Sequence, residues 1–112
     1  MWRMGTLFSG DHAIEVDDRV LAHVKVVLVT KLRRGESFTL SWVHGEGEPV
    51  GRTTVWMHPA IPLRFEFGEA QPPVLSRAWI EQMLRTANST GGVQLTAEPE
   101  PSGSDDSGSD AS

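Results

Sequence analysis

Three segments between residues 37 and 67 alternate polar and apolar side chains, and they constrain the fold more than any other part of the chain. The pattern predicts β-strands at residues 37–43, 52–58 and 61–67, because successive side chains of a strand point to opposite faces. Pro62 has no amide hydrogen to donate, so the third strand is expected to lie at a sheet edge or to begin near this proline. The expected core side carries Phe38, Leu40, Trp42, Val55, Met57, Ile61, Leu63, Phe65 and Phe67.

The valine-rich run at residues 19–34 supports two interpretations. Its β-branched side chains favour a strand. The acidic pair Asp17 and Asp18 before it, its length, its basic end and Gly35 after it favour a helix, because these are the usual caps of a helix. We predict a largely buried helix, with His23 as a core or boundary residue rather than a catalyst.

The remaining elements complete an alternating order. A hairpin is predicted from strands at residues 6–8 and 13–16, and a second helix is predicted to begin after the N-cap Ser76 and to end at residues 88–92. A short strand at residues 93–96 follows. The order β-β-α-β-β-β-α-β, with short connections, predicts an α+β two-layer domain whose two helices pack on a mainly antiparallel sheet.

Charge divides the chain into parts. The net charge is −5, from 15 acidic and 10 basic residues. Residues 97–112 contain Glu98, Glu100, Asp105, Asp106 and Asp110 and no basic residue, so residues 1–96 are neutral. We expect residues 1–3 to be an N-terminal extension, residues 4–96 a single domain, and residues 97–112 a disordered acidic tail. A neutral body disfavours nucleic-acid binding, since proteins that bind duplexes are usually basic.

Composition and motifs exclude several classes of site. The chain has no cysteine and hence no disulfide or thiolate metal site, and no apolar run long enough to span a bilayer. We expect a cytoplasmic protein without a membrane segment. Its 4 histidines are scattered and form no metal-ligand motif, and no P-loop or nucleophile elbow is present. The sequence therefore predicts no metal, no cofactor and no assigned catalytic residue.

The candidate binding residues surround Trp56. If Val55 and Met57 face the core, then Arg52, Thr54, Trp56 and His58 face the other way, and the adjoining strand would add Arg64. An exposed tryptophan between arginines could stack on a nucleobase or on an aromatic side chain of a partner. Two alternatives stay open at this point. A helix could cover Trp56 as part of the core, or an arginine could simply lie across the indole ring.

Four segments resemble a known family. They are EVDDRVLAHVKVV at residues 15–27, KLRRGESF at 31–38, WMHPAIPLRF at 56–65 and ANSTGG at 87–92. The body resembles, over about residues 4–96, short uncharacterised actinobacterial proteins treated as a domain of unknown function and often labelled ATP-dependent DNA ligase. The resemblance also suggests Met4 as the natural start.

The ligase label does not fit these residues. Such ligases use the lysine of a Lys-x-Asp-Gly motif, but Val26, Val27 and Leu28 follow Lys25, and Leu32, Arg33 and Arg34 follow Lys31. The chain is also too short for such an enzyme, so we expect no self-contained ligase activity. The leading hypothesis is a non-catalytic module that binds a protein partner through the sheet face around Trp56. The alternatives are a binder of single-stranded nucleic acid or nucleotides linked to DNA processing, and a small enzyme centred on His58.

Overall fold

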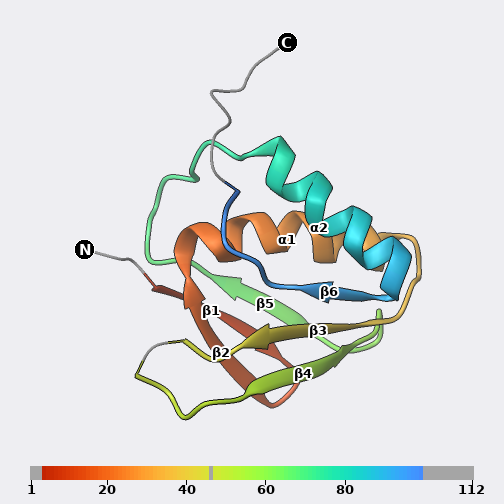
Figure 1. Ribbon diagram of the computed structural model, residues 1–112, viewed down its shortest axis with the longest axis horizontal. Coiled ribbons are helices and arrows are strands. Elements are labelled where there is room, and N and C mark those ends of the chain that lie inside the picture. The colour runs from red at the N-terminus through yellow and green to blue at the C-terminus, as the bar shows by residue number, and fades with distance from the viewer. Residues whose placement is uncertain (1–3, 46, 100–112) are drawn as a thin grey trace.

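The computed structural model describes residues 4–45 and 47–99. Its elements follow the predicted order and confirm the α+β class: β1 (Met4–Ser9), β2 (His12–Asp17), α1 (Asp18–Arg33), β3 (Phe38–Val43), β4 (Arg52–Met57), β5 (Leu63–Glu66), α2 (Arg77–Thr90) and β6 (Gly92–Gln94). Both helices lie on the same side of the strands (Figure 1). The N-terminal extension, residues 1–3, and residues 100–112 of the predicted tail lie outside the described residues.

The strands form two small sheets instead of one. The first has the order β2-β1-β5 and the second the order β4-β3-β6. All pairs are antiparallel except β3 with β6, which run parallel. The end strands of the two sheets are therefore β2, β5, β4 and β6. As predicted from Pro62, β5 is an end strand and begins at the next residue, Leu63.

Helix α1 forms because both of its ends are capped. The side chain of Asp17 accepts hydrogen bonds from the amides of Arg19 and Val20, as expected of an N-cap. At the other end, Gly35 adopts φ +75°, a conformation that L side chains rarely adopt. The amides of Gly35 and Glu36 then donate to carbonyls of the last turn, which is the Schellman arrangement. Local capping therefore outweighs the strand preference of the valines.

One hydrophobic core joins the helices to both sheets. Its fully buried members come from every element except β2 and β5: Leu7, Leu21, Val24, Val27, Leu28, Phe38, Leu40, Met57, Trp79, Met83, Ala87 and Val93. Trp79 of α2 is 1% exposed, and its indole N–H donates to the Thr96 hydroxyl at 3.2 Å. Burial of each large side chain of this kind contributes about 1.5–3 kcal/mol to stability.

His23 is a core residue of α1 that contacts Trp79 and Ser76 at the start of α2. Its side chain is 0% exposed and its ring lies 4.4 Å from that of Trp79. Nδ1 donates to the carbonyl of Arg19 at 2.7 Å, and Nε2 accepts the amide hydrogen of Ser76, also at 2.7 Å. Since Ser76 is the N-cap of α2, the histidine fixes where the second helix begins. The structure thus places His23 in the core, as predicted.

Asp18 fixes the loop between β5 and α2. Its carboxylate is largely buried and accepts the amide hydrogens of Gly68 at 2.8 Å and Glu69 at 3.1 Å. Gly5 on β1 packs so closely that an added Cβ would lie 2.7 Å from Asp18 Oδ1. The two aspartates before α1 therefore have different roles, because Asp17 caps the helix and Asp18 holds a distant loop.

Candidate functional site

Trp56 is exposed on β4. It retains 54% of its accessible surface. The side chains of Arg52 and Thr54 are exposed on the same face of the strand, whereas Met57 is 0% exposed and belongs to the core. His58 follows the strand directly and is also exposed. No helix of the described residues buries Trp56, so the alternative in which it is a core residue is wrong.

Arg64 does not join this face. It lies on β5, which pairs with β1 in the first sheet, whereas β4 pairs with β3 in the second. Its guanidinium lies 4.2 Å from the centre of the Phe8 ring and 3.3 Å from the Glu66 carboxylate. The prediction that β5 lies beside β4 is wrong, because the chain crosses to the other sheet between the two strands. Arg52, Thr54, Trp56 and His58 remain together, and Arg64 is separate from them.

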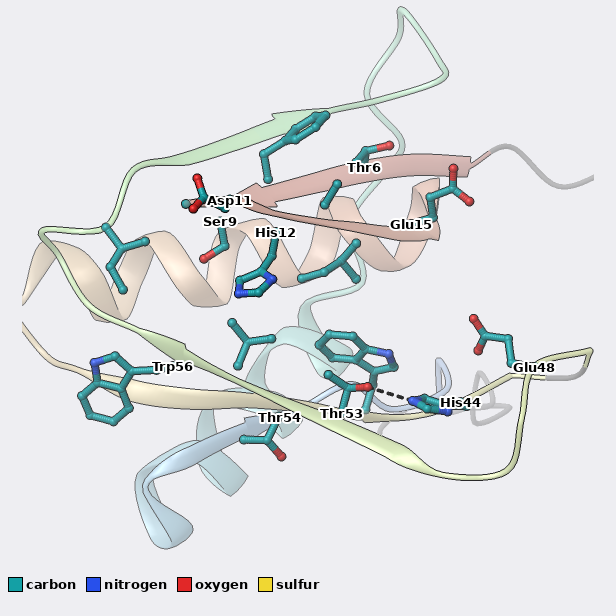
Figure 2. Close-up of a pocket in the computed structure, with 17 residues that line it drawn as sticks. Thr6, Ser9, Asp11, His12, Glu15, His44, Glu48, Thr53, Thr54 and Trp56 are labelled. Carbon is teal, nitrogen blue, oxygen red and sulfur yellow. Dashed lines mark hydrogen bonds between the residues drawn. The ribbon is translucent and has the colours of Figure 1, made fainter.

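A groove of about 1190 Å³ runs between the β1–β2 hairpin and β4. We call it the edge groove, and it is lined by Thr6, Phe8, Ser9, Gly10, Asp11, His12, Ala13, Ile14, Glu15, Trp42, His44, Glu48, Thr53, Thr54, Val55, Trp56 and Ile61. Figure 2 shows β2 and β4 on its two sides, with the indole of Trp56 at one end. Trp56, which the sequence singled out, therefore belongs to a larger concave surface.

The edge groove follows the free edges of two strands. Along β4 it is lined by four consecutive residues, 53–56, and along β2 by another four, 12–15. Consecutive side chains of a strand point to opposite faces, so a surface that touches all of them borders the backbone of the strand. Both are end strands of their sheets, so their outer backbone groups have no strand partner among the described residues.

The charged side chains that line the edge groove, among the described residues, are all acidic. Asp11, Glu15 and Glu48 carry carboxylates, and neither lysine nor arginine lines it. Glu48 accepts the amide hydrogen of Gly45 at 2.8 Å. The floor is apolar, with Ile14, Trp42 and Val55 among its residues. An acidic rim around an apolar floor favours ligands that carry positive charge and apolar groups.

His44, which lines the edge groove, and His58, near its Trp56 end, both make local hydrogen bonds. Nδ1 of His44 donates to the Pro49 carbonyl at 2.9 Å, and its Nε2 lies 2.8 Å from the Thr53 hydroxyl. These bonds brace the β3–β4 connection. His58 Nδ1 accepts the amide hydrogen of Ala60 at 3.0 Å, and this exposed ring is not among the groove residues. Within residues 4–45 and 47–99, no group of three potential ligands could hold a metal ion.

The two shortest ion pairs of the described residues lie at the two ends of α1, away from the edge groove. Hydrogen bonds from Arg19, at 2.7 and 2.8 Å, lower the pKa of Glu98, and the same pair raises the pKa of Arg19. A hydrogen bond from Lys31 lowers the pKa of Glu36. Lys31 is 4% exposed, so its pair with Glu36 is a structural contact. Glu98, which we assigned to the acidic tail, makes this contact with the folded body.

Hairpin residues such as His12 and Glu15 were not identified as site residues from the sequence. They line the same groove as Trp56 only through the packing of the two sheets, and no local motif marks such a long-range arrangement. The single sequence feature that pointed to the groove is the strand alternation that placed Trp56 outward. Alternation reports the direction of one strand's side chains but does not indicate what lies across from its edge.

A comparison with protein-family models identifies the family of the chain. The family DUF7882, described as a domain of unknown function, matches residues 4–98. The chain belongs to this family. The match spans the whole described domain, including Glu98, and it confirms the resemblance to a family of unknown function. No curated protein and no solved structure matches the DUF7882 chain at a significant level. Within the described residues, no helix of this DUF7882 domain is long and apolar enough to cross a bilayer.

Proposed function

We propose that this DUF7882 domain is a non-catalytic module that binds a protein partner at Trp56 and the adjoining edge groove. The observation that carries the proposal is the exposure of Trp56, 54%, at the end of a groove of about 1190 Å³. Tryptophan is enriched among the residues that dominate binding energy at protein interfaces. A large exposed indole beside a concave, partly apolar surface is typical of such an anchor.

The polar residues around Trp56 support binding rather than catalysis. Arg52 and Thr54 share its face of β4, and Thr54 is hydrogen-bonded to Ser41 at 2.8 Å. A general base needs a substrate-facing atom within a concave site. His58 is exposed outside the groove, and one of its ring nitrogens already accepts a backbone amide. These residues provide a rim of hydrogen-bonding groups for a partner.

The test is affinity capture from cell extract followed by titration of the purified partner. We expect Trp56→Ala to weaken binding by about 30-fold or more, which corresponds to about 2 kcal/mol. Val74 is 88% exposed and lies on the loop before α2. Val74→Ala is therefore a matched control that truncates an exposed apolar side chain away from the groove. Equal affinities for the parent protein and Trp56→Ala would overturn the proposal.

A second candidate function is binding of single-stranded nucleic acid or nucleotides, as an accessory protein linked to DNA processing. The exposed indole of Trp56 on the same strand face as Arg52 favours it. The acidic lining of the groove opposes it. Oligonucleotides that change tryptophan fluorescence, with an affinity that falls steeply as salt rises, would support this candidate. Absence of any fluorescence change with oligonucleotides would exclude this candidate.

A further inference from the structure

The free edge of β4 carries backbone hydrogen-bonding groups that have no strand partner among the described residues. The amide of His44 donates to the carbonyl of Gly51 at 2.9 Å, which continues the β3–β4 register. Pairs that exchange hydrogen bonds alternate with pairs that do not in an antiparallel ladder. Thr53 and Val55 therefore bond to β3, whereas the backbone groups of Arg52, Thr54 and Trp56 point away from it. These three residues form the open side of the strand.

The same alternation describes the opposite wall. The amide of Gly10 donates to the carbonyl of Pro62, which continues the β1–β5 register. Leu7 and Ser9 of β1 therefore bond to β2, where their partners are Ile14 and His12. The backbone groups of the intervening β2 residues point outward. The groove thus has strand edges on both sides.

Of the four end strands, β4 is the least protected against pairing. Proteins usually blunt exposed edges with short strands, proline or charged side chains. Strand β6 has 3 residues, β5 follows Pro62 and carries Arg64 and Glu66, and β2 carries Glu15 and Asp17. Strand β4 has 6 residues with no proline and a single charged side chain, Arg52, at its first position, and four of its residues, 53–56, are β-branched or aromatic. Its edge is therefore suited to accept a further strand.

We propose that the edge groove binds an extended, basic segment of a partner protein, which pairs with the free edge of β4 as an added strand. This inference rests on the proposed function and names the kind of partner. Backbone hydrogen bonds to Arg52, Thr54 and Trp56 hold the segment. Its alternate side chains contact the apolar floor formed by Trp42 and Val55, and the others carry positive charge toward the rim.

Charge complementarity selects this occupant over two others. Asp11, Glu15 and Glu48 line the groove without lysine or arginine among the described residues. The chain's own residues 97–112 carry five acids and no base, so the groove repels them. A second copy paired through β4 would bring two acidic grooves together, and like charges placed opposite each other oppose such pairing. A basic segment has neither penalty.

The experiment uses the full chain, labelled with ¹⁵N, and a blocked short peptide of alternating lysine and valine. A peptide of alternating glutamate and valine has the same apolar side chains and the opposite charge. We expect the lysine peptide alone to shift the amide signals of Arg52, Thr54 and Trp56 and to slow their hydrogen exchange. Shifts confined to other residues, absence of any shift, or equal binding of both peptides would overturn the proposal.

Two variants separate charge from backbone pairing. Asp11→Asn combined with Glu15→Gln should weaken the lysine peptide by about 2- to 30-fold at low salt, since exposed pairs contribute modestly. Thr54→Pro removes an outward amide and should abolish exchange protection, because an edge strand tolerates proline at such a position. Where far-UV circular dichroism shows that Thr54→Pro does not fold, a peptide with alternate N-methylated amides tests the same bonds on the parent protein. Unchanged binding in either test contradicts strand pairing.

The outcome also distinguishes this inference from the proposed function. Loss of partner binding in Trp56→Ala without any effect of the lysine peptide on the β4 amides would refute strand addition and leave the interaction module standing. Sedimentation that shows a dimer, disrupted by Thr54→Pro, would identify a second copy as the occupant and overturn the basic-segment proposal. No partner loss in Trp56→Ala together with no peptide effect would refute both.

Discussion

Replacement of His23 by alanine should remove a large part of the free energy of unfolding. The ring is 0% exposed, packs 4.4 Å from Trp79 and accepts the Ser76 amide hydrogen at 2.7 Å. Truncation leaves a cavity and a partly buried amide without an acceptor. Loss of a buried aromatic side chain costs about 3–5 kcal/mol, and an unsatisfied buried donor costs about 1–3 kcal/mol within that range. Single domains of this kind have about 5–15 kcal/mol of stability in total.

A second variant separates the two contributions. His23→Phe keeps the aromatic volume beside Trp79 and removes both hydrogen bonds of the ring, to the Arg19 carbonyl and to the Ser76 amide, so we expect it to cost about 1–3 kcal/mol. The matched control is His12→Ala, at an exposed position on β2, which should change stability by less than about 0.5 kcal/mol. Urea unfolding followed by circular dichroism measures all three variants.

Two results would refute this reasoning. If His23→Ala lost less than about 1 kcal/mol, the buried ring would not hold the helices together as its burial and contacts indicate. If His23→Phe matched the parent protein, the hydrogen bonds of the ring to Arg19 and to the N-cap Ser76 would contribute nothing, and packing alone would explain the role of the residue.

Three further outcomes follow from other contacts. Because Arg19 lowers the pKa of Glu98, the pair should stabilise the fold above the usual glutamate pKa of about 4.3, and its contribution should vanish as pH falls through the lowered value. Urea unfolding at several pH values should show Glu98→Gln less stable by under about 1 kcal/mol near neutrality and equal to the parent protein in acid. Gly5→Ala should cost about 1–3 kcal/mol of stability, because its Cβ would meet Asp18 Oδ1 at 2.7 Å. Gly45→Ala should cost less, because the nearest neighbour of its Cβ would lie at 3.9 Å. Thermal unfolding compares the two variants. Asp18→Ala should cost about 2 kcal/mol or more, since two loop amides lose a charged acceptor, and faster hydrogen exchange of those amides would show it directly.

The elements were predictable where local chemistry decides them. The valine-rich α1 formed as a helix because Asp17 caps its start and Gly35 closes its end, and both signals lie within a few residues of the helix. Ser76 and Gly91 bound α2 in the same way. The outward direction of Trp56 followed from strand alternation alone.

The relations between the sheets were not predictable from such signals. Short connections suggested that β4 and β5 would be neighbours, but β5 pairs with β1, which precedes it by more than fifty residues. Pairing partners depend on which arrangement buries the apolar faces of all elements together. The same long-range packing brings His12 and Glu15 to the edge groove. A single sequence carries no local record of these contacts, so Arg64 was grouped with Trp56 and the hairpin residues were not.

The parallel pairing of β3 with β6 has a consequence for how the domain folds. Thr39 pairs with Gly92, about fifty residues away, whereas β3 and β4 are close in the chain. The β3–β4 hairpin should form before β6 pairs with β3, because contacts between residues far apart in the sequence form slowly. Until β6 arrives, the other edge of β3 is open, and the apolar side chains of Phe38 and Leu40 beside it lack part of their cover. Aggregation during refolding should therefore begin from this intermediate, and substitutions that weaken β6 should increase it.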